Sequence, residues 1–100
     1  MSRFEHVHDG LVLKLRDELH LTHDYDDMWL FMEYCRNGEV GEVDLLAMAD
    51  DIYDFYEIKC NYHKKAAKKA HEQYERFCRA FPEENINGFI YTGNRGLMRL

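Results

Sequence analysis

Three charged side chains near the middle of the chain have the types and the spacing of a cation-binding site. Asp44 lies in an apolar stretch, residues 41–49, and Glu57 and Lys59 lie in a second one, residues 52–60. A charge inside a folded core is costly unless it is paired or bound to an ion. Carboxylate oxygens with a few waters suit Mg²⁺ better than zinc, so we expect Mg²⁺, or Mn²⁺ as its substitute, at Asp44 and Glu57.

The two stretches are rich in strand-forming residues, and Asp50-Asp51 is the only polar break between them. This pattern predicts a β-hairpin that turns at the two aspartates. In that register Asp44 lies opposite Glu57, and directly opposed Cβ atoms are about 4.5–5.5 Å apart, so the two carboxylates repel unless a cation lies between them. Lys59 shares a strand face with Glu57. We expect an ammonium there that orients water or neutralises a phosphate.

The order Val-Asp, then about a dozen residues, then Glu-Ile-Lys resembles the PD-(D/E)XK nuclease superfamily. Val43-Asp44 stands in place of Pro-Asp, and Glu57-Ile58-Lys59 is the (D/E)XK part. The longer run GEVDLLA is most similar to the archaeal-type Holliday-junction resolvases and their small relatives. The resemblance implies an αβββαβ restriction-endonuclease-like core. It also implies a Mg²⁺-dependent endodeoxyribonuclease that hydrolyses DNA phosphodiester bonds.

The resemblance assigns a role to each of these residues. Asp44, Glu57 and the backbone carbonyl of Ile58 are expected to hold the metal, and Lys59 is expected to position the nucleophile. A glutamine on a later helix, Gln73, matches the family residue that points into the active site and helps to orient water or phosphate. Gln73 is equally well explained as an ordinary surface glutamine.

Many members of the superfamily carry a further acidic metal ligand on the first helix, and two residues are candidates here. Glu5 lies about where the resolvase-like pattern would put it, but it also completes a capping box with Ser2. Glu18 lies at the edge of the apolar stripe of the expected helix. We take Glu5 as the expected ligand and keep Glu18 as the alternative.

The spacing of apolar residues predicts the elements that must position these side chains. In order, we expect a helix over residues 2–20, strands over 28–35, 41–49 and 52–60, a helix over 64–81, and strands over 88–92 and 97–100. Asp9-Gly10 is a potential break in the first helix, Asn37-Gly38 is a turn dipeptide, and Pro82 stops the second helix. The expected fold is one α/β domain, residues 1–100, with helices packed on a mixed sheet.

Composition and charge limit the classes of function that fit this chain. The chain is 46% hydrophobic and 14% aromatic, which argues against disorder. Its net charge of −6 is uneven, because residues 1–57 carry 15 acidic and 4 basic side chains, whereas residues 58–100 carry 4 and 9. We expect the carboxyl-terminal part to meet phosphate. No apolar run approaches the ~20 residues of a membrane span, and the three cysteines lack CxxC spacing, so we expect a cytoplasmic protein with buried free thiols.

The second expected helix carries four lysines on its exposed face, and they are the candidates for DNA backbone contacts: Lys64, Lys65, Lys68 and Lys69. Their place just after the expected metal strand favours this role, although pairing of such lysines with Glu72 on a solvated helix also explains them. A domain this small presents little surface to a duplex, so we expect a homodimer. The residues do not distinguish branched DNA from plain duplex, single strand or RNA.

Two other function classes fit part of the pattern. One is a nucleic-acid-binding module that keeps the nuclease fold but does not cut. The other is a partner-binding α/β protein in which Glu57 and Lys59 form a structural ion pair and Asp44 is incidental. The three charges on one sheet face favour the nuclease, because they cost stability unless a metal or substrate uses them.

Overall fold

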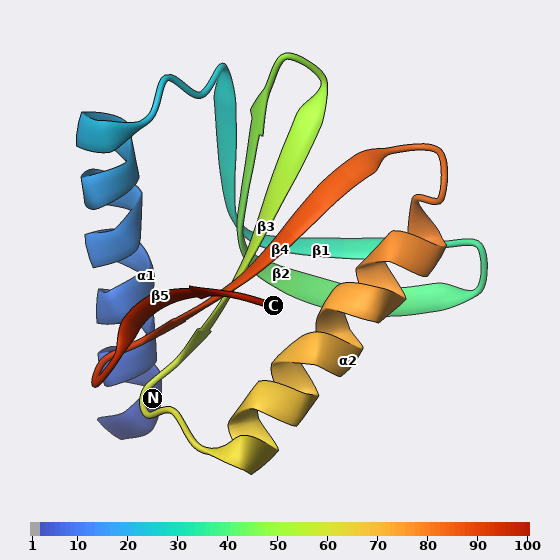
Figure 1. The fold of residues 1–100 in the computed structure, drawn as a ribbon. Coiled ribbons are helices and arrows are strands. Elements are labelled where there is room, and N and C mark those ends of the chain that lie inside the picture. The colour runs from blue at the N-terminus through green and yellow to red at the C-terminus, as the bar shows by residue number, and fades with distance from the viewer. Residues whose placement is uncertain (1–2) are drawn as a thin grey trace.

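The chain folds into two helices packed on one five-stranded sheet. The structure, a computed structural model, describes residues 3–100, with side chains from residue 6 onward. Over those residues the elements are α1 Arg3–Thr22, β1 Asp27–Arg36, β2 Glu39–Ala49, β3 Ile52–Lys59, α2 Lys64–Ala80, β4 Asn85–Thr92 and β5 Gly96–Arg99 (Figure 1). The predicted cap at Ser2 lies outside the described residues. The expected elements are otherwise present, with bounds shifted by a few residues.

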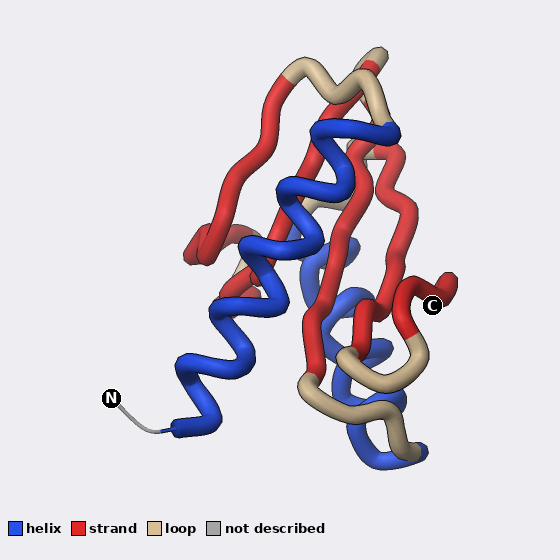
Figure 2. Tube along the Cα trace, turned by 90° about the vertical axis from the view of Figure 1, so that its left-hand side faces the viewer, coloured by secondary structure: helices blue, strands red, loops and turns tan. Residues whose placement is uncertain are grey.

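The sheet is mixed, as predicted, and its strands lie side by side in chain order from β1 to β5. The pairs β1–β2, β2–β3 and β4–β5 are antiparallel. β3 and β4 are parallel, because α2 carries the chain back along the sheet between them. The two helices cover opposite faces of the sheet (Figures 1 and 2). Within residues 3–100, no helix combines the length and the apolarity that crossing a bilayer requires.

Each helix packs over its own hydrophobic core. The core under α1 contains Val12, Leu15, Leu19, Leu45, Ala47, Tyr56, Ile58 and Tyr91. The core under α2 contains Tyr34, Val43, Leu46, Phe55, Phe77 and Ala80. Along β3 the buried side chains alternate between the two cores, so this strand is covered on both faces. Glu57, near the end of β3, is therefore buried.

The hairpin turns lie at the residues that the sequence predicted. Asp50 and Asp51 join β2 to β3 with φ values of 52° and 62°. Asn37 and Gly38 join β1 to β2 with φ values of 52° and 77°. These left-handed conformations match the right-handed twist of the strands in two-residue hairpins, and Asn, Asp and Gly adopt them most readily. The predicted register of the β2–β3 pair is confirmed from Ala49–Ile52 to Leu45–Tyr56, and the predicted Asp44–Glu57 pair lies one position beyond the end of this ladder.

The structure settles one open point of local structure and corrects one expectation. α1 continues through Asp9 and Gly10 without a break. Gly10 is exposed, and a helix tolerates a single glycine at a cost of about 1 kcal/mol. The thiols are free but not buried as expected, since Cys35 is exposed and Cys60 and Cys78 are half-buried.

Part of the way along β1 and β2, the side chains change from one face of the sheet to the other. On β2, Leu45 packs under α1, whereas Val43, two residues away, packs under α2. Side chains two apart normally share a face, so the strand changes face at Asp44. The facing residue of β1, Phe31, has a φ of 52°, and the ladder of paired residues skips both positions. Beyond this point the hairpin bends and runs across α2 (Figure 1).

Gly88 of β4 tests how closely α2 approaches the sheet. A Cβ atom added there would lie 2.7 Å from the ring of Tyr74. We expect Gly88→Ala to lower the free energy of unfolding by about 1–3 kcal/mol, because the helix must shift. Gly10→Ala, where no described atom lies within 4 Å of the new Cβ, should raise it by about 0.5–1 kcal/mol. The two variants are compared by urea unfolding followed by circular dichroism. Equal changes in the free energy of unfolding would contradict the close approach of α2 to the sheet.

Candidate functional site

The predicted carboxylates come together where β2 and β3 separate. The ladder of paired residues ends at Leu45 and Tyr56. One residue further, Oδ2 of Asp44 accepts a hydrogen bond from the backbone N–H of Ile58 at 3.0 Å. The carboxylate thus replaces a backbone acceptor and lies between the diverging strands. Asp44 is 7% exposed and Glu57 is 4% exposed, so both lie in the core.

Glu57 is left without full hydrogen bonding. Its Oε1 lies 3.7 Å from Nζ of Lys59, whereas its buried Oε2 accepts from no N–H or hydroxyl group among the described residues. Burial, next the charge of Asp44, and then a hydrogen bond between the two carboxyl groups raise the pKa of Glu57 to about 9. Burial would raise the pKa of Asp44 as well, but hydrogen bonds, first that from His8, hold it below its usual value. At neutral pH the two carboxyl groups therefore share one negative charge.

A second carboxylate on β3 shows how this fold satisfies such a group when its role is structural. Asp54 accepts hydrogen bonds from the Tyr25 hydroxyl at 2.5 Å and from Nδ2 of Asn87 at 3.1 Å, one on each oxygen. In the described part of the chain, Oε2 of Glu57 has no such donor. Unpartnered buried polar atoms are rare in native proteins and require an explanation. A cation bound between Glu57 and Asp44 would provide one.

Lys59 and Gln73 meet although they come from β3 and α2. Nζ of Lys59 donates a hydrogen bond to Oε1 of Gln73 at 3.2 Å. α2 is set close to the sheet because Ala66 and Ala70 are buried, and its first turn is capped by His63, which accepts a hydrogen bond from a backbone N–H. We refer to Asp44, Glu57 and Lys59 as the triad. The structure therefore brings Gln73, on the side of α2 that faces the sheet, to the lysine of this triad.

His8 of α1 also reaches this cluster, and the sequence analysis missed it. Its Nε2 lies 3.1 Å from Oδ2 of Asp44 and 3.1 Å from the carbonyl oxygen of Ile58. The hydrogen bond to Asp44 raises the pKa of His8 to about 9, against the opposing effect of burial. His8 is spaced four and seven residues from the buried Val12 and Leu15. A histidine on the buried stripe of a helix was the signal that could have identified it.

The remaining predicted site residues lie elsewhere. Glu18 is exposed and lies ten residues, or about 15 Å of helix, beyond His8, so the structure does not bring it to the triad. The side chain of Glu5 lies outside the described residues. The four lysines are all exposed along the first half of α2: Lys64, Lys65, Lys68 and Lys69.

The donors at the triad fit a hard divalent cation. Asp44, Glu57 and the carbonyl of Ile58 provide oxygen ligands, which Mg²⁺ and Mn²⁺ prefer. The unpartnered Oε2 of Glu57 is a ligand atom that the fold has not used. Among the described residues, no three His, Cys, Asp or Glu side chains form a ready-made metal site. A bound cation would therefore take some of its ligands from the backbone carbonyl and from water.

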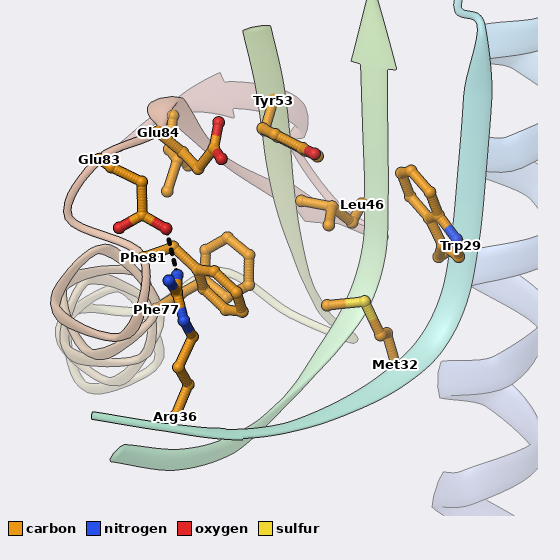
Figure 3. A pocket seen from close by; sticks show the side chains of 10 residues that line it. Trp29, Met32, Arg36, Leu46, Tyr53, Phe77, Phe81, Glu83 and Glu84 are labelled. Atoms are coloured by element: carbon orange, nitrogen blue, oxygen red, sulfur yellow. Dashed lines mark hydrogen bonds and ion pairs between the residues drawn. The ribbon is translucent and has the colours of Figure 1, made fainter. Parts of the chain in front are cut away.

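An apolar pocket of about 380 Å³ lies apart from the triad, between the sheet and the end of α2 (Figure 3). Its walls are mainly aromatic and aliphatic: Trp29, Met32, Leu46, Tyr53, Phe77, Phe81 and Ile86. At its rim Arg36 forms an ion pair with Glu83. These groups offer no convergent set of metal ligands, so the triad is the better candidate for chemistry.

Two groups at the site, His8 and Glu57, have raised pKa values that predict how stability depends on pH in a chelator. His8 and Glu57 both have folded-state pKa values of about 9, against ordinary values of 6.5 and 4.5. The folded chain keeps protons that the unfolded chain releases, so the free energy of unfolding should fall as pH rises from about 4.5 to about 9. Glu57→Gln should make the free energy of unfolding less dependent on pH below 6.5, because the titration of His8 does not yet contribute in that range.

Urea unfolding in EDTA at several pH values measures this dependence. Glu42→Gln is the matched control, because Glu42 is an exposed carboxylate two residues from Asp44 on β2. It should leave the pH dependence unchanged. A wild-type curve that is flat between pH 4.5 and 6.5 would contradict the raised pKa of Glu57.

Comparisons with known proteins bear on the fold. No family model and no curated protein matches the chain. The fold is similar to the crystal structure of a protein of unknown function, AF1548, with a TM-score of 0.61 and 16% sequence identity. The match covers 86% of this chain and 46% of that one, so this chain spans less than half of that protein's length. At this identity the likeness shows the fold alone.

Proposed function

We propose that this chain is a metal-dependent endonuclease of the PD-(D/E)XK type that hydrolyses DNA phosphodiester bonds, with the junction resolvases as its nearest model. The observation that carries the proposal is the buried Oε2 of Glu57, which lacks a partner among the described residues and lies beside Asp44. A cation between the two groups would replace the proton that they hold at neutral pH and would pair with both carboxylates. A homodimer would present two such sites to a branched DNA.

The arrangement of elements supports the proposal. A helix is followed by an antiparallel three-stranded meander, a crossover helix and a strand parallel to β3. This is the αβββαβ order that the motif resemblance implies. Asp44 lies on the second strand of the meander, and Glu57 and Lys59 lie on the third. The motif residues thus come from the strands that a PD-(D/E)XK core would use.

Each residue has a separate task in the proposed reaction. Asp44, Glu57 and the carbonyl of Ile58 would hold Mg²⁺ or Mn²⁺, which activates a water and stabilises the charge that develops on the phosphate. Lys59 lies between Glu57 and Gln73, so its ammonium is held at the triad, where it would position the water or a phosphate oxygen. Gln73 accepts from Lys59 through Oε1, which leaves its amide N–H groups for water or phosphate.

α2 supplies a basic surface for the DNA backbone. One side of the helix faces β4, where the Tyr74 hydroxyl donates to a backbone carbonyl at 2.7 Å. Another side faces β2, where Arg79 pairs with Glu39 at 2.8 Å. At about 100° per residue, Lys69 and Lys65 lie about 40° and 80° around the helix from Gln73, which contacts Lys59, whereas Lys68 and Lys64 lie about 140° and 180° away. Among the four lysines, Lys69 and Lys65 are therefore the best placed to hold a phosphate backbone that enters the triad.

Cleavage assays test the proposed reaction. Labelled four-way junction, plain duplex and single-stranded DNA are offered in Mg²⁺, Mn²⁺ or EDTA. We expect cutting in either metal and none in EDTA. Asp44→Asn and Glu57→Gln should abolish it, because each removes a metal ligand, and Lys59→Ala should slow single-turnover cleavage by about 10²–10³-fold.

Glu42→Gln is again the matched control and should cut at the wild-type rate, because Glu42 is exposed. If the wild type shifts DNA but cuts none of the three substrates, the chain is a binding module on this fold. If it neither cuts nor binds DNA or RNA, the partner-binding protein with a structural charge cluster is the better account.

The lysines predict a change in the salt dependence of DNA binding. Each lost phosphate contact should lower the slope of log K against log salt by about 0.9. We expect Lys65→Gln combined with Lys69→Gln to lower it by roughly 1–2 for duplex DNA in EDTA. Lys14→Gln combined with Arg16→Gln removes the same charge from α1, on the other face of the sheet, and should change it less. Equal salt-dependence slopes for the wild type and the α2 variant would show that these lysines of α2 do not contact the DNA backbone.

A further inference from the structure

We propose that a groove between α2 and β5 binds an unpaired base of the DNA, on the side of α2 away from the triad. The groove has a volume of about 280 Å³. Ala67, Ile90 and Met98 give it an apolar lining, and Tyr62 and His71 also line it. We call it the α2–β5 groove. The inference rests on the proposed function in one respect, because it takes DNA as the partner.

The ring of Tyr62 is held in place by the turn that follows β4. The guanidinium carbon of Arg95 lies over this ring, 4.6 Å from its centroid. The backbone N–H of Tyr62 donates to Oδ1 of Asn94 at 2.8 Å, and the N–H of Gly93 donates to the carbonyl oxygen of Cys60 at 3.0 Å. These contacts join the turn to the segment that precedes α2. A base that stacks in the groove therefore meets a ring that is already ordered, which lowers the entropic cost of binding.

The chemistry of the groove suits a nucleobase. Proteins that bind single strands stack bases on aromatic rings and arginine guanidinium groups beside a positively charged surface. The apolar side chains of Ile90 and Met98, which are paired across β4 and β5, can cover more of the base. Among the described residues that line the groove none is acidic, and His71 is paired with Glu75 at 2.8 Å. Arg95 is exposed and has no carboxylate partner in the described part of the chain, so its charge is available to a phosphate.

A basic surface leads from the triad to the groove. Four exposed lysines follow one another round the outer side of α2, at about 40°, 80°, 140° and 180° from Gln73: Lys69, Lys65, Lys68 and Lys64. In the same direction, His71 and Ala67 of the groove follow at about 200° and 240°. The helix is about 10–12 Å wide, a distance that a few nucleotides of a single strand can span.

This path predicts the class of substrate. A base inside a duplex is paired and stacked, so only an unpaired base can enter the α2–β5 groove. The strand that reaches the groove from the triad must therefore be unpaired beside the phosphate that is cut. We expect the protein to prefer DNA with unpaired nucleotides at the cleavage point, such as a flap or an open branch, over plain duplex.

Fluorescence anisotropy in EDTA measures binding without cutting. The probes are a labelled oligothymidylate and a strand of the same length in which abasic sites replace the bases. We expect the wild type to bind the oligothymidylate at least about fivefold more tightly, because the abasic strand keeps the phosphates but loses the stacking. Tyr62→Leu removes the ring and should bind the two strands about equally. Equal affinities in the wild type would overturn the inference, and so would a preference that survives in Tyr62→Leu.

Tyr53→Leu is the matched control. Tyr53 is a half-buried tyrosine near the start of β3, six residues or about 20 Å of strand from Lys59, and its variant should keep the preference for bases. Loss of the preference in both variants would overturn the inference. Photocrosslinking of the wild type to 5-iododeoxyuridine in the oligothymidylate does not depend on the folding of any variant. A crosslink to Tyr62, His71 or Met98 supports the groove, and crosslinks only outside it would overturn the inference.

Cleavage assays separate failure of this inference from failure of the proposed function. In Mg²⁺, the ratio of kcat/KM for a flap to that for plain duplex should exceed one in the wild type and fall at least about fivefold in Tyr62→Leu. If the wild type cuts DNA but binds the two strands equally in EDTA, the nuclease stands and the groove falls. If it prefers the strand with bases but cuts nothing, the groove stands and the nuclease falls. If it binds neither strand, the groove falls whatever the cleavage assay shows.

Discussion

The structure depends on one irregular point, where β1 and β2 turn over at Phe31 and Asp44. Phe31 has a φ of 52°, a conformation that residues other than glycine rarely adopt. Such strain persists only where the surroundings hold it. Here Leu45 packs under α1 on one side of the point and Val43 packs under α2 on the other. Because the strands change face here, Asp44 does not pair in the ladder. Its carboxylate accepts a hydrogen bond from the backbone N–H of Ile58, where β2 and β3 separate.

The candidate site lies at the end of β3, within reach of side chains from both helices. β3 is covered on both faces, so only its end can combine a buried carboxylate with access to solvent. Glu57 and Lys59 come from this strand, His8 reaches them from α1, and Gln73 reaches them from α2. Opposite faces of the sheet thus contribute different chemistry to one place. An imidazole approaches the carboxylates from one face, and an ammonium held by an amide lies on the other.

The fold satisfies the two carboxylates of β3 to different degrees. Asp54 belongs to a satisfied network with Tyr25 and Asn87, and such a network stabilises the fold. Glu57, three residues later, is buried with a raised pKa and with one oxygen that no described donor reaches. A protein that needed only a stable sheet would carry an apolar side chain at that position. This difference between Glu57 and Asp54 is the observation behind the proposed metal site.

The sequence by itself determined the elements and the β2–β3 register, because these depend on short-range signals. Asp50 and Asp51 suit the left-handed turn, and the strand period of two then places Asp44 opposite Glu57. The helical repeat likewise predicted α2, the helix that carries Gln73. Only the tertiary structure decided that His8 meets Asp44, a contact across 36 residues. That contact depends on how α1 crosses the sheet and on where the strands change face, and both are set by packing on two cores at once rather than by any local pattern.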